Sequence, residues 1–153
     1  MPWTSLIVYV DDEVDNPARL TEACALAKAH GARLIGVSGC APETPMADAY
    51  GAGILLGEVI AAQQARNEAM LKTARQRFAA AVDTAQVAGE WRGDIGDPTG
   101  LTLRHMRAAD AALVGRDAGG ASAWRAPHPA DLAMRSGRPV VVLSPDPIRS
   151  MVD

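Results

Sequence analysis

The chain has few aromatic residues, few cysteines and no long apolar run. Aromatic side chains make up only 4% of its 153 residues, although 48% are hydrophobic. The core must therefore gain its stability from many modest contacts between small side chains. No stretch is long enough to cross a bilayer, and no positive charge precedes an apolar run at the start. These absences predict one domain over residues 1–153 that is cytoplasmic and has no membrane partner.

Clustered basic residues and paired cysteines are also missing. The formal net charge is -3 and the basic residues are scattered, so no stripe exists that would bind a phosphate backbone. Nucleic acid is therefore excluded as a partner. Cys24 and Cys40 stand alone, without the close spacing of a zinc or redox motif. We expect both to be small, buried, inert thiols.

Apolar runs and helical patterns alternate along the chain. Strands are predicted over residues 6–10, 32–38, 89–93, 111–115 and 139–143, and helices over about 16–30, 55–82, 98–109 and 131–136. Residues 39–53 read as a loop, either a lid or a connector. Five strands alternating with four helices predict an α/β fold: an open, doubly wound, five-stranded parallel sheet with helices on both faces. The weak strand 89–93 suits an edge.

Ligands of such a sheet bind beyond the carboxyl ends of the strands, where the strand order reverses. The residues at these ends are Asp11-Asp12-Glu13, Val37-Ser38, the loop 115–120 and Ser144. The acidic run could bind magnesium. A solvated strand end that favours the following helix N-terminus is the preferred interpretation, and no metal site is predicted.

Several short motifs occur in a characteristic order. They are Val10-Asp11 closing the first strand, Gly96-Asp97-Pro98 before a helix, Ala109-Asp110 leading into Leu113-Val114-Gly115-Arg116, and Gly137-Arg138-Pro139 before the last strand. Over nearly the whole chain this pattern resembles the universal stress protein family. The resemblance implies a role in the stress response, the strand order 3-2-1-4-5 and a homodimer formed through the last strand.

Many members of that family bind ATP, which makes an adenine nucleotide the cofactor and partner that the resemblance implies. Asp11 and Val37 match the nucleoside contacts, and Gly115 matches the first glycine of the phosphate loop. The second glycine position holds Ala118. Gly119 and Gly120 can replace it in a shifted register.

The turn into the last helix departs further from the family pattern. Ala126-Pro127-His128-Pro129 stands where a Gly-Ser pair is expected. Proline has no backbone N–H, so two donors of a phosphate cradle are missing there. Arg116 and Arg125 can compensate as charged phosphate ligands.

Three functions remain open. The first is a sensing or scaffolding homodimer with weak or absent ATP binding, with no enzymatic activity beyond slow ATP hydrolysis. The second is a genuine ATP-binding member of the family. The third is a small α/β enzyme of unknown substrate, although no nucleophile, base and orienting group come together at the strand ends. His128 reads as an exposed loop histidine with no nearby carboxylate to orient it, and Trp91 and Trp124 read as packing residues.

Overall fold

The computed structural model describes residues 2–11, 16–41, 53–116 and 125–143. Strands and helices alternate strictly along them. The elements are β1 (Ser5–Tyr9), α1 (Asn16–His30), β2 (Arg33–Cys40), α2 (Gly53–Ala85), β3 (Gly89–Ile95), α3 (Pro98–Met106), β4 (Ala111–Gly115), α4 (Pro129–Ser136) and β5 (Val140–Leu143). All nine predicted elements are present, so the predicted α/β class is confirmed.

The five strands form one parallel sheet in the order β3-β2-β1-β4-β5. This order was predicted from the family resemblance and is confirmed. β1 lies at the centre, and β3 and β5 are the edges, as expected for the weak strand 89–93. The order reverses between β1 and β4, which is where a crevice opens at the carboxyl ends of the strands.

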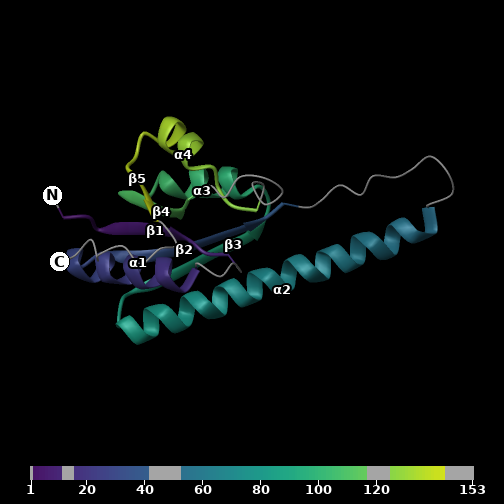
Figure 1. Cartoon of the computed structure of the whole chain (residues 1–153), viewed down its shortest axis with the longest axis horizontal. Coiled ribbons are helices and arrows are strands. Elements are labelled where there is room, and N and C mark those ends of the chain that lie inside the picture. Colours follow the sequence, from purple (N-terminus) through teal and green to yellow (C-terminus); the bar gives the residue numbers. More distant parts are fainter. Residues whose placement is uncertain (1, 12–15, 42–52, 117–124, 144–153) are drawn as a thin grey trace.

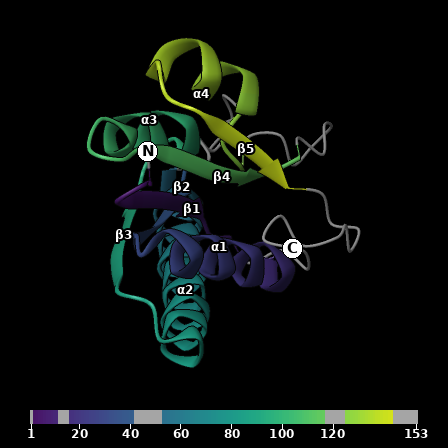
Figure 2. The ribbon, with the colours of Figure 1, turned by 90° about the vertical axis from the view of Figure 1, so that its left-hand side faces the viewer.

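Helices cover both faces of the sheet. α1 and α2 lie on one face and α3 and α4 on the other (Figures 1 and 2). Every residue of β1 is buried. Because side chains alternate along a strand, Leu6, Val8 and Val10 pack toward α1 and α2, whereas Ile7 and Tyr9 join the core under α3 and α4. A continuous apolar run is therefore what this central position requires.

Local capping signals set several helix ends. The Asp97 carboxylate accepts a hydrogen bond from the N–H of Gly100 at 2.6 Å and caps α3, as predicted. Gly31 and Gly137 both adopt φ of 63° after α1 and α4, which confirms them as helix stops. Several bounds were wrong. α3 ends at Met106 instead of residue 109 and α4 begins at Pro129 instead of residue 131, while β2 and β3 each run two residues further than predicted, to Cys40 and Ile95.

α2 exceeds its predicted length. It spans 33 residues, about 50 Å at 1.5 Å per residue, and its first half projects beyond the sheet (Figure 1). The predicted loop over 39–53 shrinks at both ends, because Gly39 and Cys40 continue β2 and Gly53 opens α2. Residues 42–52, and with them the choice between lid and connector, lie outside the described residues. Within the described part of the chain, no helix combines the length and apolar character needed to cross a bilayer.

Candidate functional site

Asp11 lies two residues after the end of β1 and is the first predicted site residue. Only 8% of it is exposed, and its Oδ2 lies 3.0 Å from Nη1 of Arg19. The prediction of a solvated strand end is therefore wrong for Asp11, because Arg19 of α1 supplies a buried counter-ion. Asp12 and Glu13 lie outside the described residues.

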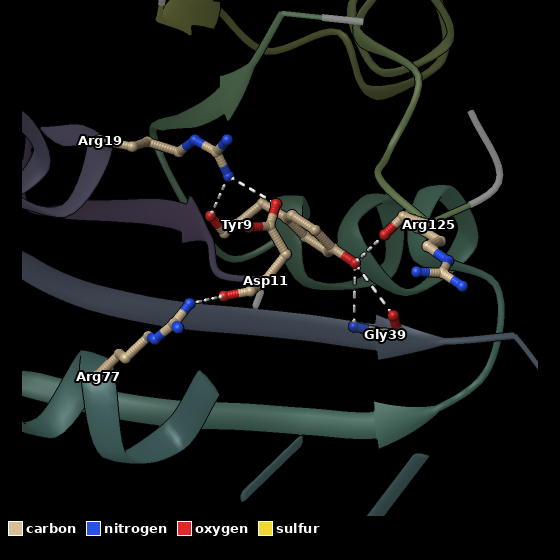
Figure 3. A network of polar contacts seen from close by, with 6 residues as sticks. All are labelled: Tyr9, Asp11, Arg19, Gly39, Arg77 and Arg125. Carbon is tan, nitrogen blue, oxygen red and sulfur yellow. Dashed lines mark hydrogen bonds and ion pairs between the residues drawn. The ribbon is translucent and has the colours of Figure 1, made fainter. Parts of the chain in front are cut away.

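Arg19 reaches this position from the first turn of α1. It is 7% exposed, and its Nη1 also donates to the carbonyl oxygen of Tyr9 at 3.2 Å (Figure 3). A cation in the first turn opposes the positive end of the helix dipole. Such a placement needs a specific partner, and Asp11 is that partner. Sequence reasoning missed Arg19, although its unfavourable helix position was a usable signal.

Gly115 ends β4 and faces the same guanidinium. A Cβ built on Gly115 would overlap Nη2 of Arg19 and would lie 2.9 Å from its Cζ. Glycine at this position therefore makes room for an internal arginine. The Arg19 side chain fills the space between the ends of β1 and β4, at the point where the strand order reverses.

Tyr9 forms a second set of contacts at the carboxyl edge. Its hydroxyl lies 3.0 Å from the carbonyl oxygens of both Gly39 and Arg125, and it accepts a bond from Gly39 N–H at 3.4 Å (Figure 3). Burial raises the pKa of Tyr9 far above its ordinary value of 10.0, so the phenol stays protonated. Sequence reasoning took Tyr9 only as an apolar strand residue, although a buried phenol needs a hydrogen-bond partner.

Val37 was predicted to offer its backbone to a nucleoside from the end of the second strand. β2 continues to Cys40, so Val37 lies three residues inside the strand. Its carbonyl oxygen accepts a hydrogen bond from Val10 N–H at 2.8 Å. The carboxyl end of β2 is formed by Gly39 and Cys40 instead.

The start of α4 offers few backbone donors, as the sequence indicated. Pro127 and Pro129 have no N–H, and the N–H of His128 donates to Thr99 Oγ1 at 3.0 Å. The imidazole of His128 has a carboxylate within reach, because Asp131 lies one turn along α4 with its Oδ1 3.9 Å from Nδ1. The prediction that no carboxylate lies near His128 was therefore wrong.

The structure describes only some of the other residues singled out in the sequence. Arg116 has an exposed side chain, and its N–H donates to the Leu143 carbonyl at 3.1 Å. Four of them lie outside the described residues: Gly119, Gly120, Trp124 and Ser144.

Trp91 packs against Phe78 with ring centroids 5.7 Å apart. Cys24 and Cys40 are buried, as predicted, and no disulfide joins them. Among the described residues, no cluster of three histidine, cysteine or acidic side chains could hold a metal ion.

No family model and no curated protein matches the sequence, but solved structures do match its fold. UspA from Lactobacillus plantarum, a universal stress protein, is 19% identical, with a TM-score of 0.66 over 94% of this chain and 99% of that one. A universal stress protein in complex with cAMP is 22% identical, with a TM-score of 0.61 over 95% and 100%. One from Arabidopsis thaliana with AMP bound is 13% identical, with a TM-score of 0.57 over 94% and 93%.

The chain has the universal stress protein fold. The match spans nearly the full length of each protein, so the whole sheet and its helices are shared. Within this fold, the chain places Arg19 in the crevice that the parallel sheet opens between β1 and β4.

Proposed function

We propose that this chain is a universal stress protein that senses or scaffolds as a cytoplasmic homodimer in the stress response. In this proposal its ATP binding is weak or absent, and it is not an enzyme beyond at most slow ATP hydrolysis. The single observation that carries the proposal is the buried Arg19 side chain. It pairs with Asp11 and packs on Gly115, two of the residues that the family resemblance assigns to the nucleotide.

The start of α4 supports the same proposal. Phosphates bind where several backbone N–H groups point at one place. Here two prolines remove their donors, and Thr99 uses the N–H of His128. A triphosphate would therefore depend on side chains such as Arg116 and Arg125 more than on a backbone cradle.

The exposed edge of the sheet supports a homodimer through β5. This strand pairs only with β4 among the described strands, and Val142 on it is 48% exposed. An open strand edge with an apolar side chain is suited to pairing with another chain. The two buried cysteines, which no disulfide joins, also fit a reducing, cytoplasmic compartment.

A titration with ATP tests the proposed nucleotide behaviour. A ligand that binds only the folded state adds about 2.7 kcal/mol of stability at one hundred times its Kd. We expect millimolar ATP with magnesium to leave the thermal midpoint of the wild type unchanged. In calorimetric titrations, Arg19→Ala, checked for folding by circular dichroism, should bind adenine nucleotide more tightly than the wild type.

The second candidate function is a genuine adenine nucleotide-binding protein. The neighbours of the same fold that are complexed with cAMP and AMP favour it. Tight wild-type binding that Asp11→Asn abolishes would establish this candidate and refute weak binding.

Sedimentation tests the dimer. Val142→Lys should convert the dimer to monomers, because it places a charge on the exposed β5 edge. Val59→Lys on α2 is the matched control, since Val59 is 49% exposed, and it should leave the dimer intact. A wild-type monomer, or a dimer that survives Val142→Lys, would refute pairing through β5.

A further inference from the structure

An apolar groove runs along the outside of the molecule between α1 and α2. It encloses about 650 Å³, within the range of small-molecule sites. Its apolar lining consists mainly of Leu20, Cys24, Ala25, Ala80, Ala81 and Ala85. Protein interiors and helix contacts are normally close-packed. Here small side chains on both helices leave a hollow.

The threonine hydroxyls and the cysteine thiol of this lining do not require a polar ligand. Thr21 and Thr84 already donate their hydroxyl hydrogens to carbonyl oxygens of their own helices, at 2.9 and 2.8 Å. Burial raises the pKa of Cys24, so its thiol stays neutral. The groove therefore favours an apolar chain over a polar or charged one.

Cations mark the two ends of the groove. Lys28 lies in the last turn of α1, and no described carboxylate forms an ion pair with it. Arg77 lies at the opposite end, where it donates to the Asp11 carbonyl oxygen at 3.4 Å. The stretch from Pro17 to Lys28 measures about 16 Å along the helix. The groove can hold one extended chain with an anionic head at Lys28.

From this geometry we propose that the α1–α2 groove binds a medium-length to long-chain carboxylate, with the apolar chain along the alanines and the carboxylate at Lys28. Of the residues that the structure describes, only eleven line the groove, whereas a stable protein interface takes about 20–30 residues a side. The volume of the groove, its apolar lining and the positive charge at its end together favour an acyl chain over a partner protein as the ligand.

Calorimetric titration with dodecanoate below its micellar concentration tests the proposal. The wild type should bind dodecanoate and prefer it to dodecyltrimethylammonium, which has the same chain and the opposite charge. Ala80→Phe fills the groove and should weaken binding at least tenfold. Lys28→Gln should weaken it by at most about fivefold, the upper end of the range for an exposed ion pair, and reduce the preference for the anion.

Matched variants control for general surface effects. Ala79→Phe adds the same ring to the residue just before Ala80 on α2, which does not line the groove. Lys72→Gln removes an exposed charge elsewhere on α2. Both should bind dodecanoate as the wild type does. The proposal fails if the wild type does not bind, if Ala80→Phe binds equally well, or if both amphiphiles bind alike. It also fails if Ala80→Phe dissociates the protein in sedimentation, because the groove would then be occupied by a second copy. ATP titrations report separately on the crevice.

Discussion

Helix α1 borders two regions of opposite character. At the carboxyl edge of the sheet, its Arg19 fills the crevice between β1 and β4 with a buried ion pair. Along α2, its Leu20 and Cys24 face a hollow that the neighbouring alanines leave open. Arg19 thus occupies a place between the strand ends where a doubly wound sheet usually takes its ligand. The open space lies between two helices instead.

One residue touches both regions. Arg77 lines the groove and also donates to the Asp11 carbonyl oxygen (Figure 3). Hydrogen bonds and an ion pair hold the side chains of the crevice in place, whereas the open space of the groove exists because the side chains that line it are small. Substitutions should therefore affect the two regions differently.

Removing the arginine should have the largest effect. Arg19→Ala leaves the buried Asp11 carboxylate without its counter-ion, and breaking a buried pair in this way typically costs about 3 kcal/mol or more. We expect a loss of about 3 kcal/mol in the free energy of unfolding, measured by urea denaturation. The double variant Arg19→Ala/Asp11→Ala should recover part of it.

The exposed pair between Arg33 and Glu90 is the control for this experiment. Their side chains are 49% and 36% exposed, and exposed pairs contribute about 1 kcal/mol or less. Arg33→Ala should therefore change stability only slightly. Equal losses for Arg19→Ala and Arg33→Ala would contradict the burial argument.

Enlarging one side chain in the crevice and one in the groove compares a filled space with an open one. Gly115→Ala places a methyl group where the Arg19 guanidinium lies, and overpacking of this kind typically costs about 1–3 kcal/mol. Ala80→Leu adds more carbon at the groove and should stay within about 0.5 kcal/mol of the wild type. Thermal or urea unfolding measures both. If Gly115→Ala left the free energy of unfolding unchanged, Arg19 would be able to leave the crevice with little loss of stability.

Removing one hydroxyl tests the other contacts of the carboxyl edge. Tyr9→Phe keeps the ring and deletes the group that joins Gly39 to Arg125. Leaving buried partners of a hydrogen bond unsatisfied typically costs about 1–3 kcal/mol. We expect a loss of about 1.5 kcal/mol in urea denaturation. Hydrogen exchange should show faster opening around residues 125–128, and unchanged exchange there would contradict the proposed link.

Local patterns predicted most of the fold. The apolar runs of β1 and β4, the Asp97 cap and the glycine stops at Gly31 and Gly137 are each set by residues close in sequence. These signals act within one or two turns, so they could be recognised along the chain. Helix lengths were less accurate, because packing against the sheet overrides the weak signals at their ends.

The contacts of the candidate site could only be predicted in part. Asp11 and Gly115 were placed at the correct strand ends, but the Arg19 side chain between them was missed. Its position depends on how α1 crosses the sheet and on Gly115, almost one hundred residues away. From the sequence, an arginine on a helix is expected to be exposed to solvent. Only the tertiary packing shows that Arg19 is buried.

A second carboxylate separates the effect of burial from that of hydrogen bonding. Asp110 lies at the amino edge of the sheet, where its Oδ2 accepts bonds from Thr4 N–H at 2.7 Å, the Thr4 hydroxyl at 2.9 Å and Ser5 N–H at 3.0 Å. These bonds hold its pKa below the ordinary value of 3.8. Unlike Asp11, Asp110 is accessible to solvent, so its contribution to stability should be smaller than that of Asp11.

The pH dependence of Asp110→Asn tests this contribution. Because the folded state has the lower pKa, it binds fewer protons than the unfolded state, and the carboxylate stabilises the fold above the unfolded pKa. The stability difference between wild type and Asp110→Asn should therefore be fully present at neutral pH, decline as the pH falls below about 3.8 and vanish only below the lowered pKa of the folded state. Urea denaturation at several pH values measures it. A difference that persists unchanged in acid would mean that the asparagine alters packing at the amino edge, and that the lost charge is not the cause.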